Sequence, residues 1–322
     1  MVIAPYYHNI IHMLLRQHIH NYLRGMIILN IKQKRILIFG AGVVGSIYAL
    51  RFAQSGLDVT LLTRGERLKS LKKDGLRYND NGVIKHISIK VIEKLEDNDI
   101  YDFIFVPVRY DQAESALLAI KNNHSRTIIS LTNTMGYDRW LEIVGGRLLP
   151  GFPGAGGDMK DGILYAQFGS EKHQGTIFGE INGQITERVK DLAQIFEVSN
   201  LHYEIQENIK AFHISHTATA IVIKHFYTNA GMMDIETAKS KDTLLKIAKE
   251  FKQNIHLVTK AGIPVIPKET KLMGELSEDD IIAMYRKMLS NDFTIDVLLG
   301  NHAISAKAEI LLLDELFHKK VN

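Results

Sequence analysis

The sequence predicts an α/β fold, and three observations indicate it. A glycine-rich turn joins an apolar strand to a helix near the N-terminus, strand-like and helix-like runs then alternate, and long helical periodicity takes over from about residue 208. We therefore expect a Rossmann-type dinucleotide-binding domain followed by an all-helical C-terminal domain. The predicted boundaries are 1–30 for a loosely ordered N-terminal extension, 31–203 for the dinucleotide-binding domain and 204–322 for a helical substrate domain.

The N-terminal extension differs in composition from the rest of the chain. The first 35 residues contain no Asp or Glu, five Lys or Arg and four His. A targeting peptide stays open because the segment is basic and partly amphipathic, but no apolar run followed by a small-residue cleavage site is present. Met26 lies ten residues before the first predicted strand, which favours an upstream extension that is attached only loosely.

Residues 36–64 contain an apolar strand, a glycine turn, a helix and a second strand, in that order. Gly40, Gly42 and Gly45 have the spacing of the dinucleotide fingerprint, which needs a tight turn, close backbone approach to a pyrophosphate and close helix packing. Free N–H groups at the helix N-terminus would bind the pyrophosphate. We expect the cofactor to contact Gly40, Ala41, Gly42, Val43, Val44 and Gly45.

The end of the second strand indicates which dinucleotide is bound. NAD-binding proteins place an acid there for the ribose hydroxyls, whereas NADP-binding proteins place a cation. This strand ends in Arg64, and no acid occurs before Glu66. The Arg64 fork could hold a 2′-phosphate through charge-assisted hydrogen bonds, so we predict NADP(H) as the cofactor. Lys69, Lys72 and Lys73 follow, and a solvated basic face explains them better.

Composition excludes several classes of function. The formal net charge of +3 is too small to indicate a nucleic-acid partner, and no apolar run approaches the roughly 20 residues that cross a bilayer. The absence of Cys excludes disulfides, a thiol nucleophile and a cysteine zinc site. We expect a cytoplasmic protein with a small-molecule substrate and neither a nucleic-acid nor a membrane partner; a homodimer is left open.

The segments after the fingerprint continue the alternation of strands and helices. Gly82–Ile92 is β-rich, Asp102–Val108 and Thr127–Thr132 are predicted strands, and Asp111–Lys121 is a predicted helix. We predict Pro150–Gly157 to be a loop. Two further strands, Gly162–Gly169 and Gly175–Ile181, are expected to pair around the polar turn Ser170–Gln174. Helices are predicted over Ala211–Asn229, Ile235–Ala261, Asp279–Leu299 and Ala303–Phe317.

Several motifs resemble those of the ketopantoate reductase family, NADPH-dependent enzymes that reduce 2-dehydropantoate to pantoate. The fingerprint and the strand end LLTRGERL, which contains Arg64, are two of them. In VPVRYDQAESAL, Arg109 stands where the family usually has Lys, and SLTNTMG is similar to the family's LQNGMG, with Asn133 as its Asn. The resemblance implies that Asn133 faces cofactor and substrate, and that Asn208–Thr228 is the catalytic helix.

The substrate half departs from the family pattern. The family's catalytic helix presents a lysine that protonates the alkoxide, followed by asparagines one and two turns on. Aligned through 208–211, this chain has His216, Ala220 and Lys224 at those positions. The stretch TIDVLLG is similar to the family's EIDYING, with Thr294 in place of Glu. The resemblance therefore implies a divergent member whose substrate can differ from 2-dehydropantoate.

Ketone reduction needs a hydride donor, a hydrogen bond to the carbonyl oxygen and a proton source. His216 is the first candidate for the proton source, because the unperturbed pKa of histidine is about 6.5. A satisfied helix histidine is the competing interpretation. Lys224 shares the helix face but lies about 12 Å further along the axis, so it serves only a substrate bound lower in the cleft. His213 and His216 lack a third ligand, and no metal is expected.

Other side chains follow the predicted strands. Arg109 and Asn133 lie where such folds bind ligands, so we expect both to bind the cofactor, and Arg109 could instead hold a substrate carboxylate. An ordinary surface arginine and a turn-forming asparagine are the competing interpretations. Asp296 and Glu309 are interpreted as exposed helix charges.

These patterns together favour an NADPH-dependent reductase of a 2-oxo acid, with 2-dehydropantoate as the first candidate substrate. The active site would lie between the two domains. Reduction of another branched 2-oxo acid or ketone, and a non-catalytic NADP(H)-binding sensor, remain as alternatives.

Overall fold

The computed structural model describes residues 29–168 and 175–321, apart from the side chains at 167, 168, 292, 293, 296, 297, 301 and 302. Most of the predicted extension 1–30, including Met26, lies outside the described residues, and so does the predicted turn Ser170–Gln174.

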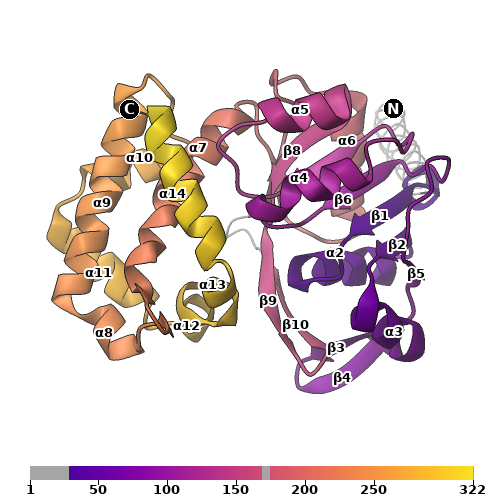
Figure 1. The fold of residues 1–322 in the computed structure, drawn as a ribbon, viewed down its shortest axis with the longest axis horizontal. Coiled ribbons are helices and arrows are strands. Elements are labelled where there is room, and N and C mark those ends of the chain that lie inside the picture. The colour runs from indigo at the N-terminus through magenta and orange to yellow at the C-terminus, as the bar shows by residue number, and fades with distance from the viewer. Residues whose placement is uncertain (1–28, 169–174, 322) are drawn as a thin grey trace, which may run out of the picture.

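An eight-stranded sheet forms the centre of the N-terminal half (Figure 1). Its strand order is β12-β11-β8-β7-β6-β1-β2-β5. In this sheet the pair of β11 and β8 is antiparallel, and all other neighbouring strands are parallel. The chain leaves β1 toward β2 and β5, then returns to β6 on the other side of β1. The topological switch point, where such sheets bind ligands, therefore lies between β1 and β6. The strands are β1 Arg35–Phe39, β2 Asp58–Leu62, β5 Lys90–Ile92, β6 Phe103–Val106, β7 Ile128–Leu131, β8 Leu148–Phe152, β11 Thr176–Phe178 and β12 Tyr203–Ile205.

Helices cover both faces of this sheet. Alternate residues of β1 point to opposite faces: Ile36 and Ile38 join one apolar cluster with α2 and α6, and Leu37 joins another with α4 and α5. Buried aromatic rings of Tyr48 and Phe52 on α2 fill the first cluster. The predicted Rossmann-type half is thus confirmed. Its helices are α2 Val43–Gln54, α3 Gly65–Asp74, α4 Tyr110–Ala119, α5 Asp138–Val144 and α6 Glu187–Val198.

A second sheet, of order β4-β3-β10-β9, packs against α2. The prediction of a loop over Pro150–Gly157 is wrong, because β8 and β9 occupy most of it. The predicted pairing of Gly162–Gly169 with Gly175–Ile181 is also wrong, since β10 pairs with β9 and β3 whereas β11 pairs with β8 and β12. These strands are β3 Leu76–Asp80, β4 Val83–Ile87, β9 Ala155–Lys160 and β10 Ile163–Phe168.

The C-terminal half packs its helices around α9, whose apolar face contacts α7 and α11. A short hairpin of β13 and β14 interrupts the series of helices, so the prediction of an all-helical domain is wrong in this detail. Among the residues described, no helix is long and apolar enough to cross a membrane. The elements are α7 Ile209–Ala220, η2 Ile221–Phe226, β13 Tyr227–Thr228, β14 Gly231–Met232, α8 Ile235–Lys239, α9 Lys241–Lys260, α10 Lys268–Glu275, α11 Glu278–Met288, α12 Asp292–Leu299, α13 Asn301–Ser305 and α14 Lys307–Val321.

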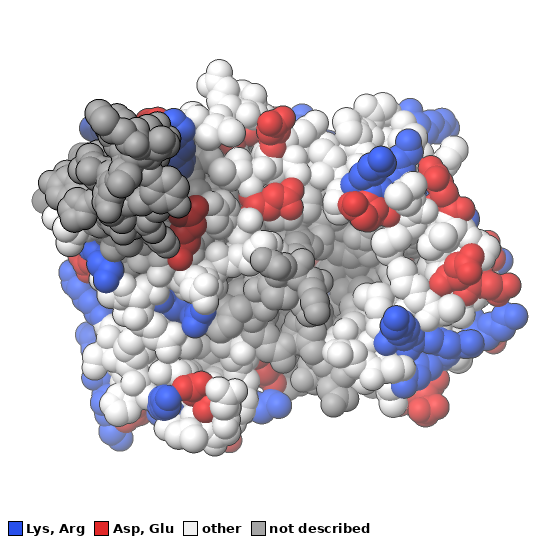
Figure 2. Space-filling model, turned by 180° about the vertical axis from the view of Figure 1, so that it is seen from behind, with Lys and Arg blue, Asp and Glu red and all other residues white. Residues whose placement is uncertain are grey.

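Helix α14 lies on the side of the helical half that faces the sheet, where it contacts α4 (Figure 1). On the opposite face of the molecule, basic and acidic side chains are interspersed around both halves (Figure 2). The contact of α14 with α4 places side chains of the helical half at the strand ends.

Candidate active site

Five predicted or newly found groups lie along one edge of the main sheet. Parallel strands end at the same edge, and Gly40 follows β1, Arg64 follows β2, Arg109 follows β6 and Asn133 follows β7. Phe152 ends β8, the next strand in order. Neighbouring strands are about 4.8 Å apart, so the positions from β8 to β2 span roughly 20 Å. This edge is long enough for an extended dinucleotide and a small substrate beside it.

The fingerprint turn has the shape that a pyrophosphate needs. Gly40 has φ +103°, which favours glycine, and a Cβ at Gly45 would lie 2.1 Å from the Gly40 carbonyl oxygen. Gly42 caps α2, and the space around its missing Cβ is open to 4 Å. The first N–H groups of α2 therefore face an open turn, and the residues present fit a dinucleotide phosphate.

Arg64 is exposed at the N-cap of α3 and has no ion-pair or hydrogen-bond partner among the described residues. Its guanidinium is therefore available to a ligand at the end of β2. Lys69 forms an exposed ion pair with Glu66, 2.7 Å between Nζ and Oε1, and Lys72 and Lys73 are exposed on the same helix. An exposed ion pair of this kind contributes little to stability. Arg64 is thus the cation at the start of α3 that is free to bind a ligand beside the fingerprint turn.

Arg67 is a second cation at the fingerprint, and the sequence reasoning did not identify it. Its Nε donates to the carbonyl oxygen of Ala41 at 3.3 Å, and its Nη2 donates to Ser46 Oγ at 3.3 Å. A third hydrogen bond reaches the carbonyl oxygen of Gly162 in the second sheet. Burial, and then the nearby charge of Arg77, lower the pKa of Arg67. The spacing of three residues between Arg64 and Arg67 on one helix was the available signal.

Arg109, Asn133 and Glu309 meet at the ends of β6 and β7. The Arg109 guanidinium donates to Ser305 Oγ of α13, and the backbone N–H of Tyr110 donates to Glu309 Oε1 at 2.9 Å. The Asn133 side chain also hydrogen-bonds to the Glu309 carboxyl, while its Oδ1 is buried without a partner in the described structure. Both halves of the chain therefore contribute to this cluster, as a site between two domains requires.

The interpretation of Glu309 as an exposed helix charge is wrong. Glu309 is only 6% exposed, because the first turn of α14 packs on the N-terminus of α4. Burial raises the pKa of Glu309 above its usual value, although the Tyr110 N–H and the Arg109 charge act in the opposite direction. The apolar spacing of α14 gave no sign of this contact. The side chain of Asp296 lies outside the described residues.

His216 lies on α7 above the end of β8. Its ring is 4.1 Å from the Phe152 ring, centroid to centroid, and it stacks on Phe212. Burial lowers the pKa of His216 to about 4, so the imidazole is neutral at neutral pH. The expectation that its pKa lies close to working pH is therefore wrong. A neutral ring can still donate one N–H, but it is a poor source of a proton.

His213 has a structural environment. Tyr137 Oη contacts its Nδ1 at 2.5 Å, and its Nε2 is 3.1 Å from the carbonyl oxygen of Gly151. Nε2 therefore donates to the carbonyl and Nδ1 accepts from the tyrosine. Burial lowers the pKa of His213 to about 3. With both ring nitrogens engaged, His213 has no ring nitrogen left for a metal shared with His216.

Lys224 is engaged inside the helical half. Its Nζ lies 2.8 Å from Glu250 Oε1 and 2.6 Å from Asp314 Oδ1. Burial opposes the charge, but the hydrogen bonds to these two carboxylates hold the pKa of Lys224 above its usual value. None of its contacts in the described structure reaches the strand ends. The structure thus separates Lys224 from the cluster of Arg109, Asn133 and Glu309.

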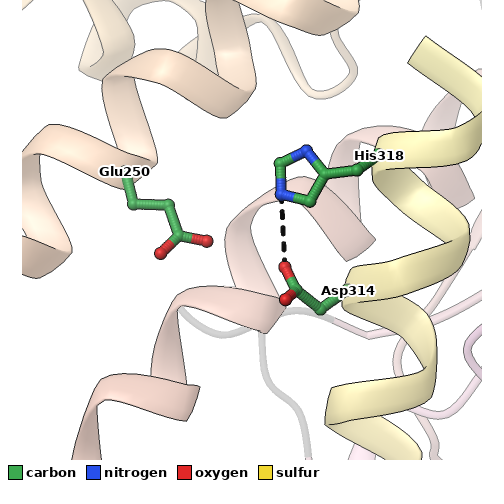
Figure 3. Close-up of side chains that lie close together, drawn as sticks. All are labelled: Glu250, Asp314 and His318. Atoms are coloured by element: carbon green, nitrogen blue, oxygen red, sulfur yellow. Dashed lines mark ion pairs between the residues drawn. The ribbon is translucent and has the colours of Figure 1, made fainter. Parts of the chain in front are cut away.

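The acids around Lys224 also have the arrangement of metal ligands. Figure 3 shows Glu250 of α9 and Asp314 and His318 of α14 directed toward one another, with an ion-pair distance of 3.4 Å between His318 Nε2 and Asp314 Oδ1. One ligand atom from each lies within 4.8 Å of the others. The Lys224 ammonium contacts both carboxylates, so part of the negative charge that a metal cation would neutralise is already balanced.

Comparison with known proteins gives a consistent family. The family described as "Ketopantoate reductase PanE/ApbA" matches residues 36–175. The 2-dehydropantoate 2-reductase of Lactococcus lactis is 26% identical over 303 residues, which cover 85% of this chain and 91% of that protein. The 2-dehydropantoate 2-reductase of Archaeoglobus fulgidus is 27% identical over 179 residues, 55% of this chain and 58% of that protein.

Solved structures show the same fold. A structure described as a ketopantoate reductase of Ralstonia solanacearum has a TM-score of 0.65 and 18% identity, covering 89% of this chain and 97% of that one. D-mandelate dehydrogenase with NADH and anilino(oxo)acetate has a TM-score of 0.64 and 20% identity, covering 89% and 98%. The fold, the fingerprint and the relatives agree: residues 36–175 match the ketopantoate reductase family, and the chain is similar to 2-dehydropantoate 2-reductases over most of its length.

Proposed function

We propose that this protein binds NADPH and reduces a 2-oxo acid to the 2-hydroxy acid, with 2-dehydropantoate as the first candidate substrate. The observation that carries the proposal is the row of ligand-binding groups at the carboxyl edge of the sheet, with the fingerprint turn beside the switch point between β1 and β6. The curated relatives are named 2-dehydropantoate 2-reductases, and a structural neighbour holds NADH with an oxo acid.

The residues at the strand ends divide the binding of cofactor and substrate between them. The turn Gly40–Gly45 binds the pyrophosphate, and Arg64 binds the 2′-phosphate that distinguishes NADPH from NADH. NADPH, when bound, supplies the hydride. Arg109 binds the substrate carboxylate, since a guanidinium offers two parallel donors to it. Asn133 orients the nicotinamide or the carbonyl, and the neutral ring of His216 donates an N–H toward the carbonyl oxygen.

The Lys224 alternative for catalysis has less support, because its ammonium is already paired with two carboxylates. We retain NADP(H) as the expected cofactor on the strength of Arg64. A non-catalytic NADP(H) sensor remains the second candidate, favoured by the absence of a lysine at position 216.

Turnover decides between the two. NADPH oxidation is followed by absorbance with a panel of 2-oxo acids, including 2-dehydropantoate, 2-oxoisovalerate and phenylglyoxylate. Turnover of at least one of them supports the reductase, and the highest kcat/KM names the substrate class. NADPH binding by fluorescence with no turnover of any panel member would overturn the proposal in favour of the sensor.

A further inference from the structure

Glu309 is the acid that the helical half brings to the strand ends. It lies in the first turn of α14, and its carboxyl accepts a hydrogen bond from the Tyr110 N–H at the N-terminus of α4, at 2.9 Å. Asn133 hydrogen-bonds to the same carboxyl from the end of β7. These contacts come from the N-terminus of α4, which follows β6, and from the end of β7, where the proposed carboxylate and nicotinamide sites lie. Glu309 therefore lies beside the groups that are proposed to bind the substrate carboxylate and the nicotinamide.

The surroundings of Glu309 form an anion site. Helix α4 has ten residues, its first N–H groups carry partial positive charge, and Arg109 caps it. Without a substrate, the Glu309 carboxylate supplies the negative charge that this site favours. A 2-oxo acid bound to Arg109 brings a second carboxylate into the same site. Two like charges in a buried site disfavour each other, so one of the two acids takes up a proton.

Burial has the largest effect on the pKa of Glu309 and favours its protonated form. Arg109 lowers its pKa, whereas burial and Asp111 raise it. Tyr227 of β13 also faces it, with its hydroxyl donating to the carbonyl oxygen of Ala303. On its own helix, Lys307 donates to the carbonyl oxygen of Thr228 and does not pair with Glu309. Once a substrate carboxylate pairs with Arg109, the lowering effect of Arg109 on the pKa of Glu309 is largely cancelled.

We propose that Glu309 is the proton donor of the reduction, a role that rests on the proposed function. In this step a hydride adds to the carbonyl carbon, the C=O π pair moves to oxygen, and the resulting alkoxide takes the proton from the Glu309 carboxyl. NADP⁺, the 2-hydroxy acid and the Glu309 carboxylate remain, and solvent returns the proton. His216 then acts as a neutral hydrogen-bond donor, in agreement with its lowered pKa.

The test compares E309Q with E315Q, since Glu315 is an exposed acid two turns along the same helix that pairs with Lys319. The reaction is NADPH oxidation with the 2-oxo acid that the wild-type protein turns over. E309Q should bind NADPH normally and lose about 10²–10⁴-fold in kcat, the usual contribution of a general acid. E315Q should keep wild-type activity.

The pH profile separates a proton donor from a structural residue. A donor must be protonated, so the wild-type kcat should fall as pH rises through the pKa of Glu309, and the residual rate of E309Q should lose this dependence. E309Q with normal NADPH binding, near wild-type kcat and an unchanged profile would overturn the inference alone. A wild-type protein that turns over no 2-oxo acid would overturn the proposed function and, with it, this role.

H216Q provides the comparison for the competing donor. It should lower kcat while the high-pH fall persists, because Glu309 is still present. If kcat no longer falls at high pH in H216Q but still falls in E309Q, His216 is the proton donor and the inference is refuted.

Discussion

Arg67 Nε donates to the carbonyl oxygen of Ala41 at 3.3 Å and so ties helix α3 to the fingerprint turn. Because this contact holds the turn itself and not the 2′-phosphate, Arg67 supports binding of NADPH and NADH alike. Arg67→Met should weaken both cofactors by a similar factor, about three- to thirtyfold, since hydrogen bonds of this kind contribute about 1 kcal/mol each. Fluorescence titrations with both cofactors measure this. A loss confined to NADPH would show that Arg67 binds the 2′-phosphate directly.

Arg64 should determine the choice of cofactor. It is exposed at the end of β2 without a partner in the described structure. We expect NADPH to bind at least tenfold more tightly than NADH, corresponding to about 1.4 kcal/mol. Arg64→Asp should erase or reverse this preference, whereas Lys72→Asp, at an exposed site further along α3, should change it little. Equal affinities of the wild-type protein for both cofactors would refute the assignment.

The fingerprint and the main βαβ alternation could be predicted because they depend on local sequence. The four strands of the second sheet were missed in part. Two turns, Asn81-Gly82 and Asp161-Gly162, have positive φ at both residues, 52° and 88° in the first and 51° and 72° in the second. Asn-Gly and Asp-Gly are the dipeptides that favour such two-residue hairpins, so this signal was present in the sequence.

The contacts at the active site could not be predicted in the same way. Glu309 and Tyr110 are 199 positions apart, and their contact depends on how the helical half packs on α4. Periodicity identifies a helix and its apolar face, but it does not specify which residue of a distant element that face meets. The pKa of His216 likewise depends on burial by Phe152 and Phe212, which only the folded structure shows.

Lys224 should matter for stability more than for catalysis. Its ammonium joins Glu250 of α9 to Asp314 of α14, and all three side chains are largely buried. Lys224→Met removes the ammonium that the two carboxylates share and leaves Glu250 with His225 and Asp314 with His318. This loss should cost about 2 kcal/mol and lower the thermal midpoint by several degrees. NADPH affinity should stay unchanged. A variant with an unaltered midpoint and no turnover would restore Lys224 as the proton source.

The buried His213 and the half-buried His216 predict how stability depends on pH. The folded pKa values of His213 and His216 are about 3 and about 4, below the unfolded value of 6.5. The unfolded chain therefore binds more protons than the folded one below about pH 6.5, and the free energy of unfolding decreases as pH falls toward 4. Thermal midpoints measured from pH 8 to 4 should be flat above 7 and then fall. His213→Asn should flatten the fall, although loss of the Tyr137 contact lowers the whole curve; an equally steep fall in the variant would contradict this origin.

The start of the folded domain can be located by truncation. Ile31 is 1% exposed and belongs to the core cluster of α2, and Lys34 Nζ lies 2.9 Å from Asp191 Oδ2 of α6. A chain beginning at Met26 keeps both contacts and should match the full chain in thermal midpoint and NADPH affinity. A chain beginning at Gln33 loses Ile31, whose burial contributes about 1.5–3 kcal/mol, and should melt several degrees lower. If the Met26 chain melts as low as the Gln33 chain, residues before 26 contribute to the fold.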